Sequence, residues 1–209
     1  MHIEHQTRYN LSFTAVSLRP ELARIVAEHY MQVGNWDMTK VRILSSNALQ
    51  CRSVNSAVRM ERELRKRLKC LTDRQIAILA QATVDDRAAI AWLAALKYIR
   101  FAFDFATEVL REKIATHDPI LRPSDYESYA DNQSVSHPEL TQLAASSKNK
   151  IRQVLLLMLA EAGLLAPSTA LGAIQRPVLS PTVLEAIIAD NPCWLAGFLF
   201  SDAEIRSLS

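Results

Sequence analysis

Basic side chains are the residues whose type and spacing could carry chemistry in this chain, and they concentrate between Arg52 and Arg74. Over those positions Lys and Arg outnumber Asp and Glu by five, whereas over the rest of the chain the acids outnumber the bases by three. Guanidinium and ammonium groups along one surface match the phosphates of a nucleic-acid backbone. Such a run also occurs on solvated helix faces and on surfaces that dock acidic proteins, so all three interpretations stay open.

Helical periodicity gathers part of these bases into a stripe. At about 100° per residue, the apolar side chains that follow Ser53 fall on one arc and most of the bases fall on another. Helices stabilised by exposed ion pairs place opposite charges four residues apart, whereas Arg62 and Lys66 place two cations at that spacing. We predict one phosphate-contacting surface made of Arg52, Arg59, Arg62, Lys66 and Lys69.

A second basic cluster opens a later helix. Lys148, Lys150 and Arg152 lie in its first turns, and no acid occurs between Leu140 and Ala160. A helix N-terminus offers free N–H groups and a positive dipole end to an anion, whereas cations placed there gain nothing for helix stability. The three bases are predicted to form a second phosphate-contacting surface, and a solvated helix start is the alternative.

Motifs for catalysis or metal binding are not evident. The five histidines form no HExxH motif, and the three cysteines form no CxxC motif and are widely spaced, which favours reduced thiols. Residues 147–150 match SxxK, but the companion motifs of that acyl-transfer family are absent. No phosphate-binding glycine loop occurs. We predict a protein that is not an enzyme and has no catalytic residue, metal or cofactor.

The elements that position the basic residues are expected to be helices. The chain has 209 residues, four of them Gly, and is 49% hydrophobic, so it can bury a sizeable helical core. N-cap residues and first-turn prolines mark the helix starts. These signals occur at Pro20, Trp36, Ser53, Thr72, Thr83, Ser124, Pro138, Ser146 or Ser147, Ser180 and Ser201, and Gly34 is placed to end the first helix.

The apolar run from Ala88 to Ile114 is predicted to be the centre of the core, as two consecutive helices or one bent helix. From Leu164 to Pro181, two short apolar pieces are compatible with a small β-hairpin or wing, and equally with an ordered loop. We predict an all-α, mainly helical bundle. It consists of a helical core over residues 1–145 and a C-terminal subregion over residues 146–209 that packs on the core.

One apolar segment could be mistaken for a membrane span. Val154–Leu165 is twelve residues long and contains Glu161 and Gly163, whereas a bilayer requires roughly 20 apolar residues. The N-terminal residues lack the apolar segment of a secretory signal. We therefore expect a cytoplasmic protein that has no membrane partner.

A set of short motifs lies in order between about residues 9 and 181. They are YNLSFTA at 9–15, GNWD at 34–37, NALQ at 47–50, Arg59 with EL at 63–64 and RL at 67–68, FATEVLREK at 105–113, PE at 138–139, KIRQ at 150–153 and AGLL at 162–165. In order and spacing this set resembles the BrxA family of the BREX bacteriophage-defence systems, although no single motif is specific. Beyond about Pro181 the resemblance fades.

The resemblance implies a small helical accessory protein, similar in fold to the NusB group of nucleic-acid-binding proteins, that binds DNA and does not catalyse a reaction. It carries over no active-site residues. We therefore predict a non-catalytic protein whose binding to double-stranded DNA tolerates different sequences and that works beside other BREX proteins. The alternative is a protein-interaction adaptor that assembles other defence components, with the basic stripe docking an acidic partner. The preference for DNA over RNA, the reading of base sequence and the oligomeric state stay open.

Overall fold

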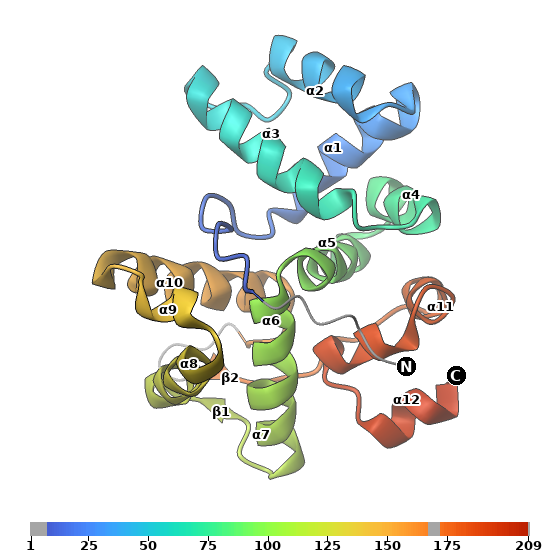
Figure 1. Ribbon diagram of the computed structural model, residues 1–209. Helices are drawn as coiled ribbons and strands as arrows, with labels where there is room; N and C mark the ends of the chain where they lie inside the picture. The colour runs from blue at the N-terminus through green and yellow to red at the C-terminus, as the bar shows by residue number, and fades with distance from the viewer. Residues whose placement is uncertain (1–7, 167–171, 209) are drawn as a thin grey trace.

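The computed structural model describes residues 8–166 and 172–208, and helices make up most of that part of the chain (Figure 1). The α-helices are α1 (Pro20–Val33), α2 (Trp36–Ser45), α3 (Val54–Leu68), α4 (Asp73–Gln81), α5 (Val84–Tyr98), α6 (Arg100–Phe105), α7 (Arg111–Ala115), α8 (Pro123–Ser136), α9 (Pro138–Thr141), α10 (Ala145–Glu161), α11 (Pro181–Ile188) and α12 (Asp202–Leu208). The remaining elements are a π-helical turn η1 (Ala106–Leu110), a 3-10 helix η2 (Pro192–Phe198) and strands β1 (Ile120–Leu121) and β2 (Gly172–Ala173). The prediction of a mainly α fold is confirmed.

Most helices begin where their capping residues predict. Pro20 is the first residue of α1, and Gly34 ends that helix in the left-handed conformation, with a φ of 68°. The Ser53 side chain caps α3, and Thr72 and Gln75 form the reciprocal capping box of α4. These ends depend on residues only a few positions apart, so the local sequence is enough to specify them.

The start of α8 differs from its prediction. Ser124 was expected to cap this helix, but Pro123 is its first residue and Arg122 is its N-cap. Proline suits the first helical position because its φ is already near the helical value and its missing N–H has no helical partner to lose. The carboxylate of Asp125 accepts a hydrogen bond from the Arg122 N–H at 2.7 Å, which replaces a serine cap.

The start of α10 also differs, because the helix begins at Ala145, before the predicted serines. The backbone alone forms this first turn: the N–H groups of Ser147 and Lys148 donate to the Ala144 carbonyl at 2.9 and 3.0 Å, and no side chain caps it. The rest of α10 includes most of the apolar run 154–165, and its buried positions face the core. Among the described residues, no helix is long and apolar enough to cross a membrane.

The predicted centre of the core is confirmed as two consecutive helical pieces. α5 ends at Tyr98, because the next residue, Ile99, has a φ of −114° and a ψ of 87° that break the helix, and the chain then continues through α6, η1 and α7. Trp92, Phe101 and Phe105 are fully buried on these elements. In Figure 1 α5 lies below α1–α4, and α6 and α7 run down the middle of the molecule with α8–α10 on one side and α11 and α12 on the other.

The chain before α1 ties α3 to α10, because it passes between these two helices (Figure 1). From α3, the Arg67 guanidinium donates to the carbonyls of Val16 and Ser17 at 2.7 and 2.6 Å. From the end of α10, Glu161 accepts hydrogen bonds from the Leu18 N–H at 2.7 Å and the Ser17 hydroxyl at 2.9 Å. Two long helices far apart in the sequence are thus joined through one short segment.

The region predicted to hold a hairpin is described except for residues 167–171. Leu165 and Ile174 form an antiparallel bridge, which is the pairing expected of a small hairpin. β2 also pairs antiparallel with β1, which places Ala173 opposite Ile120. This second pairing was not predicted, because it joins segments more than fifty residues apart in the sequence.

The C-terminal elements pack on the central helices. The Trp92 indole on α5 donates to the Gly197 carbonyl of η2 at 2.9 Å, and the Gln75 amide on α4 donates to the Ala186 carbonyl of α11 at 3.0 Å. Both hydrogen bonds are buried, so the C-terminal elements share one core with the helices on which they pack. The boundary at residue 145 and the similarity to NusB stay predictions.

Candidate nucleic-acid interface

The residues predicted to form the first phosphate-contacting surface share one exposed side of α3 and of the connection before it. The exposed residues are Arg52, Arg59, Arg62, Lys66 and Lys69, which together are called the basic face of α3 below. The helix begins at its Ser53 cap, and its apolar residues point the opposite way, so the local sequence alone orients this face.

The cations of this face have few competing partners. Arg62 Nε and Lys66 Nζ each lie 3.8 Å from the same Oε1 atom of Glu63, which is too long for a strong hydrogen bond. The other three members have no ion pair within the described part of the chain. The face therefore presents positive charge and hydrogen-bond donors to solvent, as binding to phosphates requires.

Other charged residues of the same run lie in the interior of the protein. Glu61, Glu63 and Arg67 are 0%, 3% and 2% exposed, and the Arg65 guanidinium donates to Glu61 at 2.6 Å. Burial lowers the pKa of Arg67 to about 10, so the guanidinium stays protonated at neutral pH and keeps its backbone partners. Sequence reasoning missed this structural role, although the RL motif at 67–68 was one signal of it.

The connection between α2 and α3 holds the first cation of the face in place. Asn47 and Gln50 both have the left-handed conformation that few residues other than glycine adopt, with φ of 46° and 50°. The Asn47 amide accepts from the Cys51 N–H at 3.1 Å and donates to the Cys51 carbonyl at 3.2 Å. These hydrogen bonds fix the turn immediately before Arg52. The NALQ motif at 47–50 was the available signal for this positioning role.

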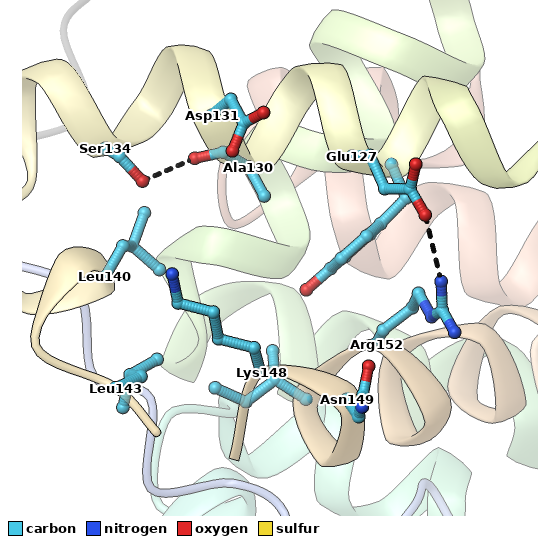
Figure 2. A pocket seen from close by; sticks show the side chains of 11 residues that line it. Glu127, Ala130, Asp131, Ser134, Leu140, Leu143, Lys148, Asn149 and Arg152 are labelled. Atoms are coloured by element: carbon cyan, nitrogen blue, oxygen red, sulfur yellow. Dashed lines mark hydrogen bonds and ion pairs between the residues drawn. The ribbon is translucent and has the colours of Figure 1, made fainter. Parts of the chain in front are cut away.

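The bases at the start of α10 do not share one hollow. Lys148 and Arg152 line a cleft between α8 and α10, whereas Lys150 lines a separate hollow beside the N-terminal segment. Figure 2 shows that Glu127 and Asp131 of α8 line the same cleft, and Arg152 Nη1 lies 3.3 Å from Glu127 Oε1. Phosphate binding by all three bases stays a prediction, and the two carboxylates oppose it.

Titratable groups that could suggest catalysis have structural partners here. Glu108 lies in the π-helical turn, and both burial and the Asp104 carboxylate raise its pKa. It accepts from the Gln133 amide at 2.7 Å, while the Tyr9 hydroxyl donates to Asp104 at 2.9 Å. These hydrogen bonds join α6, α8 and the N-terminal segment. Within the described residues, no group of three or more His, Cys, Asp or Glu side chains is arranged to hold a metal ion.

A comparison with known protein families shows to which family the chain belongs. The BrxA family profile matches residues 7–191, which include the basic face of α3 and the cleft beside α10. The chain belongs to the BrxA family. This match extends ten residues beyond Pro181, where the motif resemblance was expected to fade, and leaves η2 and α12 outside.

Two relatives of this BrxA-family chain carry the description "BREX protein BrxA". The protein from Bacillus cereus (strain H3081.97) is 26% identical over 150 residues, which cover 72% of this chain and 75% of that protein. The protein from Escherichia coli O9:H4 (strain HS) is 26% identical over 141 residues, which cover 68% of this chain and 66% of that protein.

A solved structure shares the BrxA-family fold seen here. The crystal structure of an uncharacterized protein from Magnetospirillum magneticum matches with a TM-score of 0.79 and 19% sequence identity. The match covers 92% of this chain and 98% of that chain. The arrangement of helices is therefore common to both proteins.

Proposed function

We propose that this BrxA-family protein is a non-catalytic DNA-binding component of a BREX phage-defence system, and that the basic face of α3 contacts the phosphates of double-stranded DNA. The observation that carries the proposal is the exposure of all five cations of that face, three of which have no ion pair among the described residues. Membership in the BrxA family and the names of the relatives support the defence context.

The dimensions of the face suit a nucleic-acid backbone. A helix rises about 1.5 Å per residue, so the side chains from Arg59 to Lys69 extend over roughly 15 Å. Phosphates recur about every 3.4 Å of duplex axis on one strand, so this length corresponds to about four successive phosphates. Because the helix presents its side with a row of cations, which contact phosphates and not base edges, we expect binding that depends on salt and tolerates different sequences.

The test is a titration of duplex DNA with a variant in which Arg59, Arg62, Lys66 and Lys69 are replaced by Gln. Affinity should fall similarly for unrelated sequences. The slope of log K against log salt should flatten by about 0.9 for each phosphate that the variant no longer neutralises. Folding should be unaffected, because the four side chains are exposed and Gln is a good helix former.

A matched control removes the same charge from other elements. It replaces Arg111, Arg122, Arg176 and Arg206 by Gln. Equal loss of affinity in both variants would show that net charge and not the basic face governs binding. Parental affinity and salt slope in a folded α3 variant would refute the proposal.

The adaptor alternative is favoured by apolar side chains near the same end of the molecule. Met38 and Val41 lie one turn apart on α2 and are 59% and 60% exposed, and Met31 on α1 is 47% exposed. Exposed apolar groups of this kind suit binding to a protein. If the adaptor function holds, the α3 variant should keep its DNA affinity and lose co-purification with other BREX proteins.

A further inference from the structure

The cleft between α8 and α10 has the dimensions of a small-ligand site. Its volume is about 350 Å³, and α9 and the turn after it close one end. The apolar part of its lining comes from three elements and consists of Ala130, Leu140, Leu143 and Ile151. Known ligand sites combine such an apolar lining with a few convergent polar groups, at volumes from about 300 Å³ upwards.

Three polar groups of the cleft have no partner among the described residues. Lys148 of α10 and Asp131 of α8 stand on opposite walls and form no ion pair with any described side chain, although their charges are opposite. Figure 2 shows the Lys148 side chain extending from α10 into the space below α8. The third group is the hydroxyl of Tyr126, which forms no hydrogen bond within the described chain although only 8% of this residue is exposed.

The Tyr126 hydroxyl is the strongest sign that the cleft receives a ligand. The residue as a whole is buried, but its hydroxyl is not among the side-chain atoms enclosed without a partner, so it opens onto the cleft that Tyr126 lines and can bond a ligand there. Burial raises the pKa of Tyr126 to about 12, although the nearby Arg152 acts in the opposite direction. The hydroxyl is therefore protonated at neutral pH and able to donate a hydrogen bond to an anionic or carbonyl oxygen.

The charged side chains that line the cleft limit which charges its ligand can carry. A phosphate or another polyanion would meet Lys148 and Arg152 but also the carboxylates of Glu127 and Asp131, which repel it. Arg152 and Glu127 already neutralise each other as an ion pair at 3.3 Å, so Lys148 and Asp131 remain to bind a ligand. A ligand that carries one charge of each sign would satisfy both walls.

We propose that this cleft binds a small zwitterion of the α-amino-acid class with an apolar side chain. Its carboxylate would meet Lys148 and the Tyr126 hydroxyl, its ammonium group would meet Asp131, and its side chain would cover the apolar lining. The site is separate from the basic face of α3 and does not depend on the proposed DNA binding.

The test follows backbone amide resonances of the ¹⁵N-labelled full chain during titration with free leucine and free phenylalanine. Saturable shifts are expected for amides of residues 126–131 and 148–152. N-acetylleucine lacks the ammonium group and leucinamide lacks the carboxylate. Each should bind at least about tenfold more weakly than leucine, because each loses one charge-assisted hydrogen bond.

Variants assign each charge to its partner. Asp131→Asn should weaken binding of leucine about tenfold and leave binding of N-acetylleucine unchanged, whereas Lys148→Met should weaken leucine and leave leucinamide unchanged. Tyr126→Phe should reduce the affinity for leucine while the ring keeps the fold. Lys150→Met, which removes a neighbouring cation outside the cleft, is the control and should bind leucine as the parent does.

Several results would overturn the inference. These are the absence of saturable shifts with both amino acids, equal affinity for leucine and its two truncated forms, or variants that leave every affinity unchanged. If duplex DNA shifted the amides of the cleft and leucine did not, the cleft would belong to a phosphate-contacting surface. Loss of DNA binding in the α3 variant with leucine binding intact would support the separation of the two sites.

Discussion

The basic face of α3 and the start of α10 look alike in the sequence but differ in what faces them. Both are short clusters of Lys and Arg on one helix. The cations of the basic face point into solvent, and Glu63, which is the acid paired with Arg62 and Lys66, lies 3.8 Å from each of them. Two of the three bases on α10 instead face a wall that carries Glu127 and Asp131. A basic cluster is therefore informative about phosphate binding only when the neighbouring elements leave it free of acids.

The largest expected effect is at Arg67. This residue belongs to the same run of bases as the basic face of α3, but it is buried and does not lie on that face. Arg67→Met should lower the free energy of unfolding by about 3 to 5 kcal/mol, since it leaves buried carbonyls without their donor and removes a positive charge near the buried Glu63. Arg59→Met, at an exposed position, should change it by about 0.5 kcal/mol or less. Urea unfolding of both variants measures the difference, and similar stabilities would contradict the structural role of Arg67.

The next effect concerns Glu161, which binds the segment before α1 from the end of α10, as Arg67 binds it from α3. Glu161→Ala should destabilise the protein by about 1 to 3 kcal/mol, because the Leu18 N–H and the Ser17 hydroxyl lose their acceptor. The control is Glu185→Ala, which removes a carboxylate that is 66% exposed and paired only at the surface with Arg74. Thermal unfolding should separate the two variants, and equal midpoints would show that Glu161 does not hold the N-terminal segment.

A smaller effect tests the comparison between the two clusters directly. Replacing Lys148, Lys150 and Arg152 by Gln should flatten the salt dependence of DNA binding by about 0.9 or less, the value of one neutralised phosphate. The four-residue variant of α3 should flatten it by up to about 3.6. Filter-binding titrations over a range of salt concentrations give both slopes. A larger change for α10 than for α3 would reverse the ranking of the two surfaces.

The smallest effect asks whether the facing acids are what distinguishes α10. Removing them with Glu127→Gln and Asp131→Asn together should strengthen DNA binding by less than about tenfold and steepen its salt dependence slightly, because Lys148 and Arg152 then become available. Glu185→Gln with Asp202→Asn makes the same charge change elsewhere on the surface. If both double variants strengthen binding equally, the change is due to net charge and the cleft acids have no special role.

The sequence by itself determined most of the helix starts and the direction of the α3 face. Proline and glycine at the ends of α1, the serine cap of α3 and the capping box of α4 act over at most a few residues, so no distant interaction is needed to place them. The period of the helix then fixes which bases of α3 share a side. Where Pro123 competed with Ser124, the local signals conflicted, and the predicted N-cap was wrong by two residues.

Only the tertiary structure decided which charged residues become interior and which surfaces meet. Arg67 is buried because the segment before α1 brings its carbonyls to α3, about fifty residues away in the chain. β2 pairs with β1, and α8 places Glu127 and Asp131 against the start of α10, through interactions between segments that are also distant in sequence. A helical period places a side chain on a face of its own helix. What covers that face depends on long-range packing, which short-range sequence patterns do not encode.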